Sequence, residues 1–300
     1  MNIVLAYLGV VAIWATTPLA IKWSGETDWF FGVAARTALG ALLILPVAWW
    51  LVWRRQTAAR FSLDWPAVRV YLAASLPILG AMTFMYWAAQ YLPSGWIAIL
   101  FALNPVMTGI LAHFCLPNSR LSVRKILGVL ISLTGLLIIF VPNMSAQQTE
   151  MQLLAIGAAL ISVFFHSYGS VLVKRVNDSV SPVHVVVGAL WVSVLGHLML
   201  SPTALLSWPA LTSREAAAIV YAASIGSVVG FLLYFYLLKN IDAVKVSLIP
   251  VITPVFGLLL GHFLNEEPLN AAIWSGAGLV LFGLVLFEWR LQTLWGGKRR

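Results

Sequence analysis

Charged residues are scarce in this chain. They make up 9% of its 300 residues, whereas hydrophobic residues make up 61%. A soluble globular domain carries about 25% charged residues, so this sequence lacks the polar surface that a water-exposed fold needs. The mean hydropathy of +0.93 agrees with that conclusion. We therefore predict an all-α integral membrane protein.

Motifs for catalysis and for nucleotide binding are also missing. The single cysteine, Cys115, excludes an internal disulfide. The five histidines have no H-E-x-x-H neighbours, and no G-x-S-x-G elbow occurs. A Walker-type glycine loop and a charged or carbonyl filter are absent too. We therefore predict no enzyme, no ATP-driven pump, no metal and no cofactor, and keep an intramembrane enzyme only as an unlikely alternative.

Long apolar runs fill nearly the whole chain. A membrane-spanning helix needs roughly 20 mainly apolar residues, and by this rule the sequence contains ten candidates with short, charged connections. They are residues 2–22, 30–53, 67–90, 93–115, 124–142, 151–173, 183–205, 214–238, 243–264 and 270–290. No connection is long enough to be a soluble domain.

The basic residues lie on one side of this predicted topology. With both termini placed in the cytoplasm, 15 of the 18 basic residues fall inside and two, Lys22 and Arg214, fall outside. Positive charge in short loops marks the cytoplasmic side, so we predict a multi-pass inner-membrane protein with cytoplasmic termini. The net charge of +8 then reflects loops and a basic tail, 291–300, that lie on anionic lipid, and not a nucleic-acid partner.

Two stretches of the chain are nearly the same. LNPVMTGILAHF covers 103–114 and ITPVFGLLLGHF covers 252–263, so that Pro105 matches Pro254. Further on, KILGVLISLTGLLIIF and AIWSGAGLVLFGLVLF align their glycines. Because each repeat contains five spans, an odd number, the second copy enters the membrane from the opposite side. We predict two inverted five-helix repeats, at 1–149 and 150–290, which is a transporter architecture.

These features resemble a known family. WATTPLAIKW near the start, a proline-centred fourth span and G-x6-G in the last span of each half resemble the EamA-type, ten-span branch of the drug/metabolite transporter superfamily. Within it, the chain is most similar to the YddG-type exporters of aromatic amino acids. The resemblance implies secondary export of neutral or aromatic amino acids through a central cavity lined by spans 1, 3, 4, 6, 8 and 9. We expect alternating access, and a monomer, while another metabolite or drug class remains an open alternative.

Polar and aromatic residues at mid-depth are the candidates for that cavity. Polar groups are costly in hydrocarbon and tend to face a protein interior, and proline bends a helix and frees a carbonyl. The candidate substrate-binding residues are Trp14, Thr17, Met82, Tyr86, Asn104, His166, Ser227, Tyr234 and Thr253, and the candidate helix kinks are Pro105, Pro250 and Pro254. For each of them, ordinary helix–helix contact is the competing interpretation.

Two ionisable residues within the predicted spans, Arg36 and His166, bear on how the cavity could work. Arg36 lies near the outer end of span 2, and we expect its side chain to extend to the membrane interface and not to bind a substrate carboxylate. His166 is the one histidine that lies both deep and on a predicted cavity helix. Because no acidic residue falls at mid-membrane, we favour facilitated export, with proton coupling through His166 left open.

Overall fold

The described part of the chain is helical. The computed structural model describes residues 2–55, 62–116, 123–143, 149–176, 180–203, 205–206, 208–242, 246 and 249–288, and these residues contain no strand. In chain order the helices are α1 (Ile3–Ser24), α2 (Trp29–Arg55), α3 (Trp65–Ser75), η1 (Leu76–Gly80), α4 (Ala81–Ala88), α5 (Ser94–Phe101), α6 (Asn104–Cys115), α7 (Val123–Asn143), α8 (Thr149–Val176), α9 (Pro182–Leu200), α10 (Ser213–Tyr221), η2 (Ala222–Val229), α11 (Gly230–Asn240), α13 (Ile249–Asn265) and α14 (Ala271–Glu288).

Most of the predicted spans appear at full length. Eight stretches of the described chain are long and apolar enough to cross a membrane: Ile3–Ser24, Trp29–Trp50, Trp65–Ala88, Ser94–Cys115, Val123–Pro142, Glu150–Val176, Pro182–Leu200 and Ser213–Asn240. The predicted tenth span is a shorter apolar helix, Ala271–Phe287. The predicted ninth span appears as α13, which has 17 residues and begins at Ile249. The all-helical membrane fold is thus confirmed, with eight full-length spans where ten were predicted.

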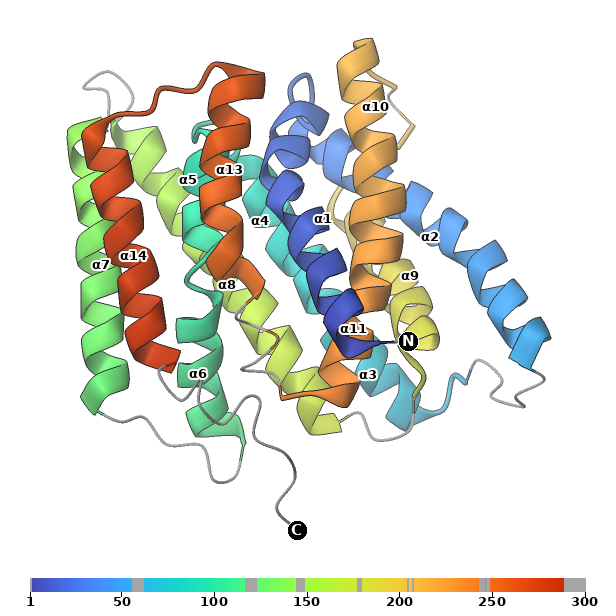
Figure 1. Cartoon of the computed structure of the whole chain (residues 1–300). Helices are drawn as coiled ribbons and strands as arrows, with labels where there is room; N and C mark the ends of the chain where they lie inside the picture. The colour runs from blue at the N-terminus through green and yellow to red at the C-terminus, as the bar shows by residue number, and fades with distance from the viewer. Residues whose placement is uncertain are drawn as a thin grey trace.

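The helices form one bundle (Figure 1). In that view α7 and α14 lie together along one side, α2 lies at the opposite edge, and α1 begins and α14 ends at the lower end. Between these edges, α1 packs on α13, α13 on α5, and α8 on both α4 and α6. Segments from the two halves of the chain therefore alternate through the middle of the bundle, where side chains from both halves meet.

The fourth predicted span is broken at its proline. The helix α5 ends at Phe101 and α6 begins at Asn104, so that Pro105 lies in the first turn of α6. Pro105 has no N–H group for the carbonyl of Phe101. Instead, Nδ2 of Asn104 donates a hydrogen bond to that carbonyl at 2.8 Å. The side chain next to the proline thus replaces the backbone donor that the proline removes.

The matching prolines of the second half behave differently. The helix α13 runs from Ile249 to Asn265 with Pro254 inside it, and Pro250 lies in its first turn. A proline in a first turn costs no intrahelical hydrogen bond. The residues just before Ile249 lie outside the described part of the chain, so the predicted kink at Pro250 stays a prediction. The helix α13 continues through Pro254, where the first half is interrupted.

Two short π-helical segments interrupt longer helices. The segment η1 connects α3 to α4, and η2 connects α10 to α11. A π segment redirects side chains because its hydrogen bonds join residues five apart, and such segments are frequent at functional sites. In η2, Oγ of Ser227 donates to the carbonyl of Ala222, five residues earlier, at 3.0 Å. This bond fixes the direction of Ser227.

Glycines bring α7 and α14 into backbone contact. A Cβ built on Gly128 would lie 2.5 Å from the carbonyl oxygen of Gly283, and one built on Gly135 would lie 2.6 Å from that of Gly276. Neither position tolerates a side chain without movement of a helix. Small residues at a helix interface are what close packing within a membrane requires, so the G-x6-G pattern serves the contact between the last helices of the two halves.

Two lysines bind the carbonyl ends of neighbouring helices. Nζ of Lys22 donates to carbonyls just beyond α4, and Nζ of Lys174 donates to carbonyls at the end of α11, at distances of 2.7 to 3.1 Å. The acceptors are Ala89 and Leu92 for Lys22, and Leu238 and Ile241 for Lys174. A cation at a helix C-terminus is favourable because the carbonyls there are negative and lack helical donors.

Candidate functional site

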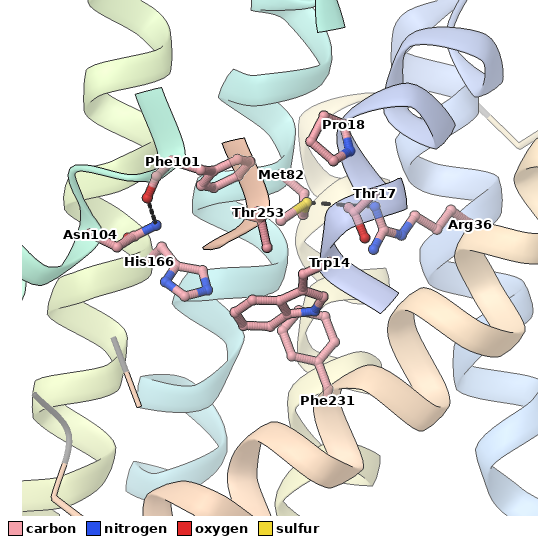
Figure 2. A pocket seen from close by; sticks show the side chains of 10 residues that line it. All are labelled: Trp14, Thr17, Pro18, Arg36, Met82, Phe101, Asn104, His166, Phe231 and Thr253. Carbon is pink, nitrogen blue, oxygen red and sulfur yellow. Dashed lines mark hydrogen bonds between the residues drawn. The ribbon is translucent and has the colours of Figure 1, made fainter. Parts of the chain in front are cut away.

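A cavity lies in the middle of the bundle, between helices of both halves (Figure 2). Its volume is only about 30 Å³. The lining residues come from α1, α2, α4, α5, α6, α8, α11 and α13. They are Trp14, Thr17, Pro18, Arg36, Met82, Phe101, Asn104, His166, Phe231 and Thr253. The site is therefore narrow and largely closed by side chains.

Aromatic rings form much of the wall. Trp14, in the middle of α1, meets His166 of α8 edge-on with ring centroids 5.4 Å apart, and Phe231 of α11 at 6.4 Å. Phe101 contacts His166 on its other side at 6.2 Å. Behind this layer, Tyr234 packs on Trp14 at 4.9 Å. Edge-to-face contacts of this kind hold aromatic rings in defined orientations, so the wall is fixed by mutual packing.

The cation of the cavity is Arg36, whose side chain is 3% exposed. Its Nε donates to Oγ of Ser227 at 3.0 Å, and its Nη1 lies 3.6 Å from Sδ of Met82. Figure 2 shows the guanidinium entering from one side of the cavity, toward Thr17 and Met82. The expectation that Arg36 extends to the membrane interface is therefore wrong. Packing of α2 on η2 turns its side chain inward and buries it.

No carboxylate balances this charge in the part of the chain that the structure describes. The ion pair found there joins Arg214 and Glu26, at 2.7 Å, on the exposed outer side of α10. Beside Arg36 the neighbour on η2 is Gly226, where an added Cβ would lie 3.3 Å from Nη2. Space for the guanidinium is thus made by a glycine, and its partners among the described residues are neutral.

The opposite side of the cavity carries neutral polar groups. Figure 2 places Asn104 and His166 across the cavity from Arg36. The amide of Asn104 donates to Phe101, and its Oδ1 accepts a hydrogen bond from Oγ of Ser167 at 3.1 Å. Asn104 is 1% exposed. It is therefore held rigidly where α5 and α6 meet α8.

Six of the nine candidate binding residues line the cavity, namely Trp14, Thr17, Met82, Asn104, His166 and Thr253. The other three lie behind or beyond it. Ser227 holds Arg36, Tyr234 packs behind Trp14 and hydrogen-bonds Ser170, and Tyr86 bonds to Oγ of Ser24 at 2.8 Å. Four lining residues were missed: Pro18, Arg36, Phe101 and Phe231. A charge inside a predicted span could have identified Arg36 as a cavity residue, whereas nothing in the sequence distinguishes a phenylalanine of the cavity from other apolar residues of the same helix.

Within the described residues, no three of the His, Cys, Asp and Glu side chains come close enough together to hold a metal ion. Chemistry at the cavity therefore rests on one arginine, aromatic rings and neutral polar groups. Such a set binds and orients a ligand.

An apolar helical bundle that surrounds a small polar and aromatic cavity is an architecture that membrane transporters use. The chain belongs to the EamA-like transporter family, whose model matches residues 1–141 and 153–289. This membership confirms the resemblance to the drug/metabolite transporter superfamily and indicates a transporter, not an enzyme.

Individual relatives are similar at modest identity. The uncharacterized transporter YoaV of Bacillus subtilis is 25% identical over 95% of this chain and 96% of its own length. The uncharacterized inner membrane transporter YedA of Escherichia coli is 28% identical over 66% of this chain and 62% of its own. The WAT1-related protein At3g02690, chloroplastic, of Arabidopsis thaliana is 24% identical over 91% of this chain, which spans 66% of that protein. A crystal structure with 19% identity superposes with a TM-score of 0.67 over 97% of this chain and 98% of that one, and so shares the fold.

Proposed function

We propose that this protein is a secondary transporter that exports small metabolites, neutral or aromatic amino acids first among them, through the central cavity. The observation that carries the proposal is the wall of Trp14, Phe101 and Phe231 around the central cavity. Flat apolar rings suit an aromatic or apolar side chain. None of the relatives described above is named for a substrate, so the choice of amino acids rests on the aromatic wall.

The transport mechanism that we propose is alternating access by two inverted five-helix repeats. Three pairs of features support the repeat. The π segments η1 and η2 each interrupt the third predicted span of a half. The acceptors of Lys22 and Lys174 are related by a shift of 149 residues, from 89 to 238 and from 92 to 241. The glycine pairs of α7 and α14 cross over, 128 with 283 and 135 with 276, as a twofold axis between aligned glycines requires.

The orientation in the membrane also belongs to the proposal. The excess of basic residues in the loops on one side, 15 against two, supports cytoplasmic termini. YedA, similar over two thirds of this chain, is named an inner membrane transporter. We therefore propose that this protein lies in the inner membrane with both termini in the cytoplasm. We also propose that it acts as a monomer and exports its substrate out of the cytoplasm.

The energy source that we propose is the gradient of the substrate itself. None of the described residues that line the cavity is an aspartate or a glutamate, so they do not supply the usual carboxylate relay for protons. His166, 5% exposed and in contact with Trp14, is the titratable group for a second possibility, proton-coupled export.

Flux measurements on purified protein in liposomes test the proposal. We expect saturable efflux of tryptophan, phenylalanine or another neutral amino acid, faster than from empty liposomes. Thr253→Trp, which fills the cavity, should abolish it. Leu137→Trp, at a side chain of α7 that is 62% exposed, should leave it unchanged. Lack of protein-dependent flux for every compound of a broad amino-acid and metabolite panel would overturn the proposal.

The same liposomes decide the energy source. If export is facilitated, a pH gradient will not change the rate of efflux by the wild type, and it will not change the rate of efflux by His166→Ala. A gradient-driven acceleration that His166→Ala removes would establish proton coupling in its place.

A further inference from the structure

Arg36 is a buried charge for which the described residues provide no counter-ion. A charged side chain within a membrane-spanning helix is costly unless it is paired. Its side chain is 3% exposed, and its partners are a serine hydroxyl and a thioether. A stable bundle gains nothing from such an arrangement, because an apolar residue of similar volume would pack there at lower cost.

The surroundings of Arg36 hold the guanidinium in place and leave donors unused. Of its five N–H groups, two have partners among the described residues, Ser227 and Met82. Ser227 is itself oriented by its bond to Ala222 within η2, and Gly226 makes room beside Nη2. The π segment therefore fixes the guanidinium at the cavity wall with hydrogen-bonding capacity to spare.

We infer that Arg36 is the carboxylate-binding residue of the cavity, and that the transported substrate must carry a carboxylate but does not need an ammonium group. The inference rests on the proposed transport function and defines its substrate class. An arginine fork matches a carboxylate with two parallel hydrogen bonds. The apolar body of the substrate then lies against Trp14, Phe101 and Phe231, which line the same cavity.

The charge balance of the cavity favours a monoanion. Arg36 is the one lysine or arginine among the described residues that line the cavity, so one carboxylate neutralises it and a phosphate dianion would leave a negative charge. An amino acid adds an ammonium group, for which the lining offers no carboxylate, only aromatic faces. Aromatic and apolar monocarboxylates are therefore bound at least as well as the corresponding amino acids, and amines without a carboxylate are excluded.

Equilibrium binding of four compounds with the same ring tests this inference on purified full-length protein. Phenylalanine has both charged groups, phenylpropionate has only the carboxylate, and phenylalaninamide and phenylethylamine have only the amine. Binding is measured instead of flux, because uncharged forms of some of these compounds cross lipid unaided. We expect phenylpropionate to bind at least as tightly as phenylalanine, and both amines to bind at least tenfold more weakly.

Variants connect the selectivity to Arg36. In Arg36→Met the affinity for phenylpropionate should fall at least tenfold, and Arg36→Lys should recover part of it, since lysine keeps the charge but not the fork. Arg214→Met, at the exposed arginine paired with Glu26, should bind like wild type. A thermal midpoint of ligand-free Arg36→Met equal to or above that of wild type shows that the variant folds and that the charge is not a structural requirement.

The outcomes separate this inference from the proposed function. Equal binding of phenylpropionate and phenylalaninamide, or undiminished phenylpropionate binding by a folded Arg36→Met, would overturn the inference while leaving transport intact. Arg36-dependent binding without flux of any compound would support the carboxylate site and overturn the transport proposal. If none of the four compounds binds, the inference is wrong for this ring class.

Discussion

The bond between Asn104 and Phe101 leads to a quantitative expectation. Nδ2 of Asn104 lies 2.8 Å from the carbonyl oxygen that Pro105 leaves without its helical donor. Replacing Asn104 by Leu keeps a similar volume but removes the donor, and an unsatisfied acceptor costs about 1–3 kcal/mol. The hydroxyl of Ser167 loses its acceptor at Oδ1 as well. We expect Asn104→Leu to destabilise the protein by about 2–4 kcal/mol.

A double-mutant cycle isolates the cause. Pro105→Ala restores a backbone N–H four residues after Phe101. If the carbonyl of Phe101 accounts for the loss, Asn104→Leu will cost about 1–2 kcal/mol less in the Pro105→Ala background than in wild type. The assay is thermal or denaturant unfolding in detergent, followed by intrinsic fluorescence.

The chain offers a matched control for this cycle. Nδ2 of Asn240 donates to the carbonyl of Tyr236 at 2.7 Å, but at an exposed helix end. Water can replace the donor there, so Asn240→Leu should cost well under about 1 kcal/mol. Additive effects of Asn104→Leu and Pro105→Ala would refute the reasoning, and so would equal losses at positions 104 and 240.

Two further expectations concern stability. Gly276→Ala puts a Cβ 2.4 Å from Cγ1 of Ile139 and 2.6 Å from the carbonyl oxygen of Gly135, so it should lower the thermal midpoint strongly. Gly278→Ala on the same helix meets nothing within 4 Å and should leave the thermal midpoint unchanged. Equal effects of the two variants would show that α7 and α14 do not pack as described. Glu267 is 9% exposed and accepts hydrogen bonds from the backbone N–H groups of Ser94 and Gly95 at 2.8 and 3.0 Å. Glu267→Gln should therefore lower the free energy of unfolding by about 1–3 kcal/mol in the same unfolding assay. A similar loss from Glu266→Gln, at its exposed neighbour, would contradict this expectation.

The fold was predictable because hydrophobic length carries most of the information in a membrane protein. Long apolar runs must become helices in lipid, where the backbone has to satisfy its own hydrogen bonds. Hydropathy alone does not show which proline interrupts a helix, because Pro105 and Pro254 occur in nearly identical sequence segments.

Polarity marked most of the cavity residues that could be predicted. Thr17, Asn104, His166 and Thr253 stood out because polar groups at mid-depth have to face other protein groups, and each lines the cavity. Phe101 and Phe231 carry no such mark. Arg36 was placed at the interface because snorkelling is the cheapest solution for an isolated helix. Its burial depends on η2, a change of helical period that hydrophobic patterning does not show.

Access to the cavity from both faces of the membrane is the central claim of this account. Because Cys115 is the sole native cysteine, Thr253→Cys in a Cys115→Ser background places one thiol in the cavity. Ser132→Cys, at a position of α7 that is fully buried against α14, serves as the unreactive control. A membrane-impermeant thiol reagent is applied from either face of oriented vesicles. Alternating access requires modification of the thiol at position 253 from both faces and protection by a transported substrate; modification from one face only, with or without substrate, would contradict it.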